Sequence, residues 1–445
     1  MGAASSRPTA VDLFAGAGGL SLGLEQAGFD VVAAVEYDPV HALAHRYNFP
    51  QCQVLCRDVR RLQAGDVMTA ARVGASRLGR PIPADGGVDL LAGGPSCQGF
   101  SSIGQRRDAD ARNDLLLEFV RLVVEMRPRA FLLENVPGLL EARFDDFRDL
   151  AFRRLRAAGY ALSGTDHWLD ASAFGVPQSR KRVVVTGVLG ESAAGEPSPS
   201  PGSPLTVRDA LDGLPHVEVY EQLLSCDSVP LTDADGARRR SAASPYARWL
   251  AGLEPAGDLA RPRAWDPAQL TNSLRTVHSP DTRRRFEGTP VGATEPTSRL
   301  FRLPLDAPAR TLRAGTGRER GAHTSPRPIH PLLPRVITVR EAARLHGYPD
   351  WFRFSGTNWH GHRQVGNSVP PPLARAAAAA LLHALGARPA TPRRLVGLGE
   401  DWWLTARPAE AGAVLPVVKG ELPPQRIRPG SPSAGSVLCS PPSVT

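Results

Sequence analysis

The sequence predicts an α/β protein whose larger part is a parallel sheet covered by helices. Over the first 190 residues, short apolar runs of strand length alternate with longer stretches of helical periodicity, which is the pattern of strand–helix–strand units. Apolar residues make up 42% and charged residues 22% of the 445, ordinary values for a soluble globular protein. At roughly 100–200 residues per domain, the chain has room for two to four domains.

The individual elements follow from the apolar runs and from the residues that cap helices. Gly28 closes a helix over residues 18–27, Pro39 occupies a favoured first-turn position, and Asn113 can cap a long helix that runs to residue 126. A further helix is predicted around residues 144–158. The predicted strands cover residues 9–14, 31–35, 88–92, 130–133 and 183–186.

The pattern changes after residue 188. Residues 189–204, with the sequence LGESAAGEPSPSPGSP, are typical of a linker. From there to about residue 334 the chain is rich in arginine and proline and has weak periodicity, so the sequence does not predict its fold. Helical periodicity returns in VITVREAARLHGY and again in residues 373–385. The chain beyond residue 388 is rich in proline and serine and is predicted to be largely disordered.

The positive charge is concentrated in one part of the chain. The formal net charge is +9, from 53 Lys and Arg against 44 Asp and Glu. Between Arg238 and Arg335 there are 18 Arg and 8 acidic residues, a local net charge of +10, so the remainder is almost neutral at −1. An arginine-rich region beside a neutral one is typical of a module that binds a polyanion. The alternative is an ordinary solvated surface.

Several classes of protein are excluded by what the sequence lacks. No run approaches 18 apolar residues, so we expect no membrane span, and the N-terminal residues do not have the layout of a signal peptide. The five cysteines are too few and too scattered for a disulfide scaffold, and Cys52 and Cys56 have no second pair nearby to complete a metal site. We therefore expect a cytosolic protein without a metal.

The motif DLFAGAGGLS (residues 12–21) places a glycine-rich turn where a predicted strand meets a helix. Glycines at this end of a parallel sheet let a nucleotide-like ligand approach the backbone closely. Ser21 occupies the position of the last glycine of a GxGxxG fingerprint, so the motif does not indicate a hydride-transfer dinucleotide. Glu36, at the end of the next strand, can accept hydrogen bonds from both hydroxyls of a ribose, or serve only at a helix start. Asp58 is a candidate acceptor for an adenine amino group.

Three more motifs border predicted strands at the same edge. GGPSCQGFS puts Cys97 on a turn, where a thiol can become a thiolate that attacks an electrophilic carbon, although a lone cysteine is commonly just a small buried side chain. ENV puts the carboxyl group of Glu134 at this edge, where it can protonate a ring nitrogen. In QSRKR, alternation puts Arg180 and Arg182 on one face, where one can grip a carbonyl oxygen and the other a phosphate.

In this order, the four motifs resemble those of the C5-cytosine-specific DNA methyltransferase family of the bacterial restriction–modification type. TVREAARLHGYPD and QVGNSVPPPLA are similar to two further blocks of that family, and the resemblance covers residues 9–188 and 335–386. It implies a Rossmann-like, doubly wound S-adenosylmethionine-dependent methyltransferase domain with a smaller target-recognition domain. The implied division is 1–188 for the first part of the catalytic domain, 189–204 for a linker, 205–350 for the target-recognition domain, 351–388 for a return segment and 389–445 for the tail.

The resemblance also implies the reaction and its residues. Cys97 would add to C6 of a cytosine flipped out of the duplex, Glu134 would stabilise the protonated N3, and Arg182 would hold O2. The implied DNA contacts are Ser101, Arg106 and Arg180. The residues implied to bind S-adenosyl-L-methionine are Phe14, Gly16, Gly18, Glu36, Tyr37, Asp58, Val59, Gly94, Leu115, Asn367 and Ser368.

One position departs from the family. The family has proline before its nucleophile, whereas this chain has Ser96. Because proline stiffens a turn, we expect the serine to change the rate rather than to abolish activity. We expect a monomer that acts on double-stranded DNA in a bacterial cytoplasm, associated with the nucleoid through DNA and paired in function with a restriction endonuclease.

Two alternatives stay open. One is a tRNA cytosine-5 methyltransferase on the same scaffold, which the long region between Arg182 and Thr338 disfavours. The other is a catalytically silent relative that binds DNA, which the presence of Cys97 and Glu134 disfavours. A nicotinamide-dependent dehydrogenase would leave the motifs after the first loop and the basic region unexplained.

Overall fold

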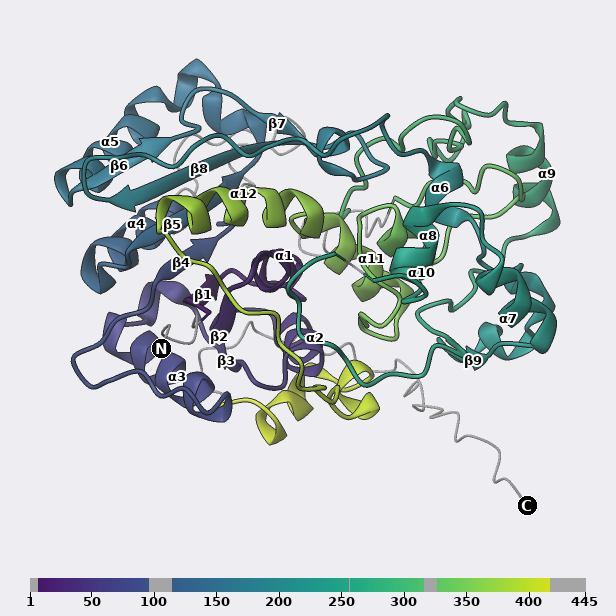
Figure 1. Cartoon of the computed structure of the whole chain (residues 1–445). Helices are drawn as coiled ribbons and strands as arrows, with labels where there is room; N and C mark the ends of the chain where they lie inside the picture. The colour runs from purple at the N-terminus through teal and green to yellow at the C-terminus, as the bar shows by residue number, and fades with distance from the viewer. Residues whose placement is uncertain (1–6, 96–113, 256, 316–325, 417–445) are drawn as a thin grey trace.

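A central sheet organises the larger part of the chain (Figure 1). The computed structural model describes residues 7–95, 114–255, 257–315 and 326–416. The eight-stranded sheet has the order β3-β2-β1-β4-β5-β8-β6, and the short strand β7 pairs with β8 outside this order. The strands are β1 (Thr9–Leu13), β2 (Asp30–Glu36), β3 (Gln53–Cys56), β4 (Leu90–Gly93), β5 (Ala130–Asn135), β6 (Tyr160–Ser163), β7 (Leu169–Asp170) and β8 (Lys181–Leu189).

Five neighbouring strands run parallel. These are β3, β2, β1, β4 and β5, whereas β8 is antiparallel to β5 and β6 is antiparallel to β8. The carboxyl ends of β1, β2, β4 and β5 and the amino end of β8 therefore lie at one edge of the sheet, which we call the carboxyl edge. The predicted α/β fold with a mainly parallel sheet is confirmed.

Helices cover both faces of the sheet because its strands are apolar on both sides. Ala10 of β1 packs under α1 (Gly19–Ala27), α2 (Pro39–Asn48) and α12 (Pro371–Ala384). Val11 and Leu13 pack on the opposite face, under α3 (Ala64–Arg77), α4 (Asp114–Met126) and α5 (Asp145–Ala157). Although α12 comes from a distant part of the chain, it lies against α1 (Figure 1) so closely that a Cβ on Gly23 would lie 2.6 Å from the carbonyl oxygen of Pro371.

The strands and helices predicted for this region are confirmed, with ends that differ by up to three residues. Four further elements, β3, α3, β6 and β7, have no clear apolar pattern in the sequence and are not among those predicted. Within the described ranges, no helix is long and apolar enough to cross a membrane.

A smaller lobe of short elements lies at the right of Figure 1. We call residues 205–336 the small lobe. Two small apolar clusters stabilise it, one around Leu223 and one around Phe286. Its elements are α6 (Val207–Leu211), β9 (Val229–Pro230), α7 (Asp233–Arg240), α8 (Pro245–Leu250), β10 (Gln269–Leu270) and α9 (Pro280–Gly288).

The chain after the small lobe packs into the main core. Apolar side chains from Ile337 to Phe354, including those of α10 (Val339–Arg344), belong to the same cluster as α1 and α12. The same cluster also includes Val207, Leu250 and Leu312 of the small lobe, so the two parts of the chain share one apolar core. After Phe354, α11 (Asn358–Asn367) leads into α12.

The segment 258–264 crosses from the small lobe to the sheet. Arg261 donates to Asp30 Oδ1 at 2.8 Å, and Arg263 donates to Glu25 Oε1 at 2.8 Å. Both carboxylates are buried. The small lobe is thus tied to β2 and α1 by buried ion pairs as well as by its two ends.

The prediction of a largely disordered tail is wrong for residues 389–416. Tyr47 of α2 donates a hydrogen bond to Asp401 at 2.9 Å, and the backbone N–H of Gly399 donates to the carbonyl of Tyr47. Leu404 and Leu415 are 3% and 4% exposed. These few apolar residues, spaced between prolines, give the segment enough burial to pack against α2. Residues 417–445 lie outside the described part of the chain.

Candidate active site

The glycine turn after β1 begins the site at the carboxyl edge. Phe14 and Gly16 have φ of +59° and +57°, and Gly18, which precedes α1, has φ of +104°. A Cβ on Gly18 would lie 2.5 Å from Cε2 of Phe49, so only glycine fits there. A Cβ on Gly16 would meet nothing within 4 Å. The turn is therefore tight on its inner side and open at Gly16, where a ligand can approach the backbone.

Glu36 ties this turn to the end of β2. Its carboxylate accepts hydrogen bonds from the backbone N–H of Gly16 and of Asp38, both at 2.8 Å. Burial raises the pKa of Glu36. Each oxygen retains a further lone pair, so the group can still accept from two hydroxyls of a ribose. The next residue, Tyr37, is 40% exposed beside it.

An apolar rim continues from the turn to the next two elements. Val59 is buried at the start of a short 3-10 helix (Val59–Arg61), and Phe14 and Leu115 are partly buried against the same cluster. Asp58 caps that short helix and pairs with Arg60 at 2.6 Å. Burial pushes the pKa of Asp58 upward, but the hydrogen bonds from Arg60 lower it more. The result is an ionised acceptor beside apolar side chains, which suits a flat ring with an amino group.

Glu134 and Arg182 form an ion pair at the same edge. Arg182 Nε lies 2.6 Å from Glu134 Oε1, and the two side chains are 12% and 11% exposed. The antiparallel pairing of β5 with β8 creates this contact, since it places Glu134 opposite Val184. A Cβ on Gly94 would lie 2.9 Å from Glu134 Oε2. A larger residue at this position after β4 would therefore crowd the Glu134 carboxylate. A carboxyl group and a guanidinium thus converge where β4, β5 and β8 meet.

Three residues predicted for the site lie outside the described residues: Cys97, Ser101 and Arg106. Cys52 and Cys56, by contrast, are both buried, and burial raises the pKa of Cys56 to about 12. Neither of these two thiols has the character of a nucleophile. Among the described residues, no group of three or more His, Cys, Asp or Glu side chains is placed to hold a metal ion.

Arg180 does not occupy the place expected for a phosphate contact. Its side chain is 1% exposed and donates to the backbone carbonyls of Leu312, Gly366 and Ser368 at 3.0, 2.8 and 3.1 Å. A guanidinium buried in this way cannot reach a DNA backbone, so the expectation is corrected. Arg180 instead holds the end of α11, where Asn367 is exposed and Ser368 is partly buried near the glycine turn.

A sequence model described as C-5 cytosine-specific DNA methylase matches residues 9–383. The chain belongs to this family. It is 42% identical over 416 residues to the Type II methyltransferase M.XorII of Xanthomonas oryzae pv. oryzae, covering 93% of both chains. It is 30% identical to the Type II methyltransferase M.AgeI of Thalassovita gelatinovora, covering 83% of this chain and 97% of that one.

A solved structure agrees with this assignment. A DNA modification methyltransferase encoded within a prophage (E. coli) superposes with a TM-score of 0.67 at 32% identity. The match covers 85% of this chain and 99% of that chain. The resemblance drawn from the motifs and the methyltransferase fold class are therefore confirmed.

The methylase contains a buried group beneath the glycine turn that the sequence analysis missed. Ser21 Oγ donates to Asp12 Oδ2 at 2.6 Å and lies 2.9 Å from His45 Nε2. Because a hydroxyl has one hydrogen, His45 Nε2 is the donor in the second bond. Burial raises the pKa of Asp12 to about 7 and lowers that of His45 to about 3. The only signal in the sequence was Ser21 in place of a glycine.

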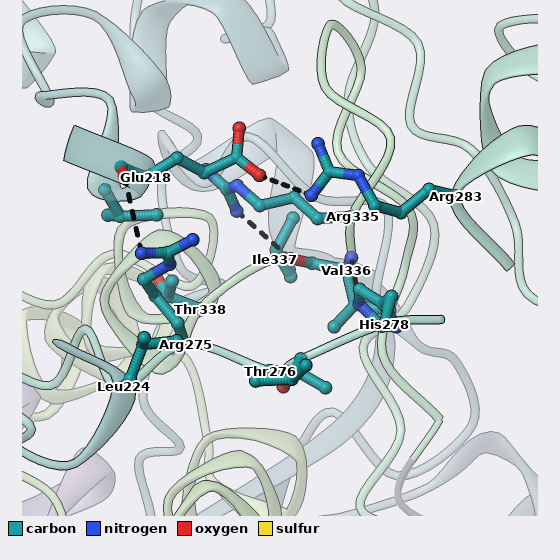
Figure 2. A pocket seen from close by; sticks show the side chains of 12 residues that line it. Glu218, Leu224, Arg275, Thr276, His278, Arg283, Arg335, Val336, Ile337 and Thr338 are labelled. Carbon is teal, nitrogen blue, oxygen red and sulfur yellow. Dashed lines mark hydrogen bonds and ion pairs between the residues drawn. The ribbon is translucent and has the colours of Figure 1, made fainter. Parts of the chain in front are cut away.

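A cavity of about 90 Å³ lies in the small lobe of the methylase (Figure 2). Its wall contains several cationic side chains, yet most of their charge is compensated. Arg283 donates to Glu218 at 2.7 Å, and Arg335 pairs with Glu341 at 2.7 Å. Arg275 donates to the backbone carbonyl of Glu218 at 3.3 Å. The cavity is therefore held together by internal pairs and does not by itself present a strong positive charge.

Proposed function

We propose that this methylase transfers a methyl group from S-adenosyl-L-methionine to C5 of a cytosine that is flipped out of a short specific sequence in duplex DNA. Membership of the C-5 cytosine-specific DNA methylase family supports the reaction. The observation that carries the proposal is the Glu134–Arg182 pair at the carboxyl edge, in line with the turn that Glu36 holds. In this proposal Glu134 would hold a proton at N3 of the pyrimidine and Arg182 would bind its O2.

The described residues fit the cofactor. Glu36 has two acceptor oxygens at the open side of the turn, and Phe14, Val59 and Leu115 offer an apolar rim. Asp58 would accept from the adenine amino group, and Asn367 and Ser368 would close over the methionine end. We assign Gly16, Gly18, Tyr37 and Gly94 to the same site. When bound, the cofactor supplies an electrophilic methyl group.

The protein must make C5 nucleophilic, since in free cytosine it is not. The thiolate of Cys97 would form a bond to C6 while Glu134 holds a proton at N3, so that electron density moves to C5. The remaining N–H donors of Arg182 would bind O2 and fix the ring. After methylation, C5 loses its proton and the bond between sulfur and C6 breaks, which restores the thiolate and the aromatic ring. The reaction needs no oxidant or reductant.

The target atom is inaccessible in a stacked duplex, so the cytosine must leave the helix. We propose that the small lobe reads the sequence in the grooves and that residues 1–188 and 351–388 carry the chemistry. Ser101 and Arg106 are proposed DNA contacts. The two relatives named Type II methyltransferases, each matched over more than four-fifths of this chain, support a role beside a restriction endonuclease. We further propose that the protein acts as a monomer on DNA in a bacterial cytoplasm.

The test is methylation sequencing in a C5-specific format. Genomic DNA from a methylation-free host that expresses the chain should carry modified cytosine in one short sequence. The matched control is Cys97→Ala, which should abolish the modification and leave DNA binding intact. Absence of modified DNA cytosine with the wild-type chain would overturn the proposal, and transfer RNA from the same cells would then be assayed.

A further inference from the structure

Residues 309–314, with the sequence ARTLRA, lie along the QSRKR motif. The backbone N–H of Ser179 donates to the carbonyl of Ala309 at 2.8 Å, and Thr311 Oγ1 donates to the carbonyl of Ser179 at 2.8 Å. The side chain of Gln178 accepts from the N–H of Leu312 at 3.0 Å. These bonds fix segment 309–314 of the small lobe directly beside the residues that lead into Arg182.

The same segment also reaches the cofactor end of the site. Leu312 accepts from Arg180, which in turn holds Gly366 and Ser368. A Cβ on Gly366 would lie 2.5 Å from the backbone nitrogen of Ala314, so the two backbones are in close contact. Segment 309–314 is therefore fixed at both ends, against residues 178–180 just before β8 and against α11.

Side chains along the segment differ sharply in exposure. Ala309 and Leu312 are 0% and 5% exposed, whereas Arg310 and Arg313 are exposed. The guanidinium of Arg310 lies 3.8 Å from the centre of the Phe301 ring, which holds it in place. Two cations thus project from a backbone that buried contacts keep rigid.

These two cations are not compensated. Neither Arg310 nor Arg313 forms an ion pair in the described part of the chain. In this they differ from Arg283 and Arg335 around the cavity of Figure 2, each of which is bound to a glutamate. Uncompensated arginines on a rigid, exposed backbone suit the phosphate oxygens of DNA, which take a large share of protein–DNA hydrogen bonds.

We infer that Arg310 and Arg313 bind backbone phosphates next to the flipped-out cytosine. The inference rests on the proposed function, and it adds residues that position the DNA. The position of the two arginines relative to the proposed cytosine site follows from the backbone. Segment 309–314 is hydrogen-bonded to residues 178–180, and Arg182 follows two residues later beside Glu134. The small lobe would thereby grip the strand at the point where the base leaves the duplex.

The first test is the salt dependence of DNA binding. Arg310→Ala and Arg313→Ala should each reduce the slope of log affinity against log salt by about 0.9. Over a fourfold rise in salt, the wild type should then lose about 3.5-fold more affinity than either single variant and about 12-fold more than the double variant. Arg→Lys at either position should keep the wild-type slope, because the charge is retained.

The matched control removes two arginines from a distant surface. Arg153 and Arg156 are exposed near the end of α5 that points away from the carboxyl edge. Their double alanine variant should bind with the wild-type slope. Equal slopes for the wild type and the Arg310/Arg313 double variant would overturn the inference.

The second test locates the phosphates. Duplexes with a neutral methylphosphonate at single positions around the modified cytosine should bind the wild type less tightly when the changed phosphate flanks that cytosine. The Arg310/Arg313 double variant should be indifferent to those same positions. Equal sensitivity of both proteins would overturn the inference while leaving the proposed function intact. Failure of the wild type to methylate any DNA would instead refute the proposed function, and the slopes would still decide the role of the two arginines.

Discussion

The ion pair between Glu134 and Arg182 makes each side chain depend on the other for its position. Glu134→Gln keeps the size of the side chain but cannot supply a proton to a ring nitrogen. We expect methyl transfer to fall by about 10²- to 10⁴-fold, the usual loss when a general acid is removed. Incorporation of labelled methyl groups into duplex DNA would measure it. The control is Glu141→Gln, an exposed glutamate nearby that pairs with Arg143. Activity of Glu134→Gln within tenfold of the wild type would contradict the assignment.

The raised pKa of Asp12 predicts that the stability of the fold depends on pH. Its pKa is about 7 in the folded chain, against an ordinary value of 3.8. The folded state therefore keeps a proton that the unfolded state releases, and stability declines as the pH rises from about 4 to about 7. Between pH 5 and pH 8 the expected loss is about 3 kcal/mol. Asp12→Asn should lack this loss, as urea unfolding at the two pH values would measure. A decline of the same size in both proteins would rule out the explanation.

The sequence could predict those site residues whose position in the sheet follows from the order of the motifs. Glu36 ends β2 and Glu134 is the last residue but one of β5, so their position at the same edge of the sheet follows from topology. Arg180 could not be placed in this way. Alternation along the strand predicts the face of the sheet on which the Arg180 side chain lies. It does not predict that Leu312 and Gly366, more than 130 residues away in the sequence, cover this side chain.

Helices and strands were predictable where their apolar residues are large and closely spaced. The 13 residues of α4 include leucine, valine and phenylalanine in a helical pattern. In contrast, α3 has the sequence AGDVMTAARVGASR and buries mainly alanine and glycine, which carry little periodic signal. β3 and β6 have four residues each, too few for a pattern of period two to stand out.

A buried cluster around Asp350 stabilises α7 and α10. Arg239 and Arg344 each lie 2.6 Å from Asp350 Oδ2, and all three side chains are buried. Asp350→Asn would leave buried guanidinium groups without their counter-charge, so we expect a loss of about 3–5 kcal/mol in the free energy of unfolding. The matched control is Asp306→Asn, whose exposed pair with Arg208 should contribute less than about 1 kcal/mol. Equal melting temperatures for both variants would contradict the role of the cluster.

The tail between residues 389 and 416 contributes to the stability of the catalytic side. Leu404 is 3% exposed against the main core, so Leu404→Ala should cost about 2–5 kcal/mol, measured by urea unfolding. Leu395→Ala is the control, because Leu395 belongs to the same tail but is 60% exposed. Identical unfolding curves for the two variants would mean that the tail does not pack as described.

The high arginine content between residues 238 and 335 marks an unusual region, but it does not show which of the arginines are exposed. Of the arginines between residues 238 and 335, Arg239, Arg263 and Arg335 are buried and paired within the protein. Composition counts such residues together with exposed ones such as Arg313. Only the structure separates charges that hold the fold together from charges that can reach DNA.

The ion pairs of segment 258–264 limit how specificity could be exchanged between relatives. A chimera cut at residues 205 and 334 would import foreign side chains opposite Glu25 and Asp30, two buried carboxylates that here bind Arg263 and Arg261. Asp30 would still pair with Arg7 and Arg80, whereas Glu25 would lose Arg263. An unpaired buried charge costs about 3–5 kcal/mol, a large share of the stability of a typical protein. A graft that replaces residues 214–256 and 265–308 but retains segments 258–264 and 309–314 keeps those partners. The small lobe is thus transplantable only as two inserts between native anchors.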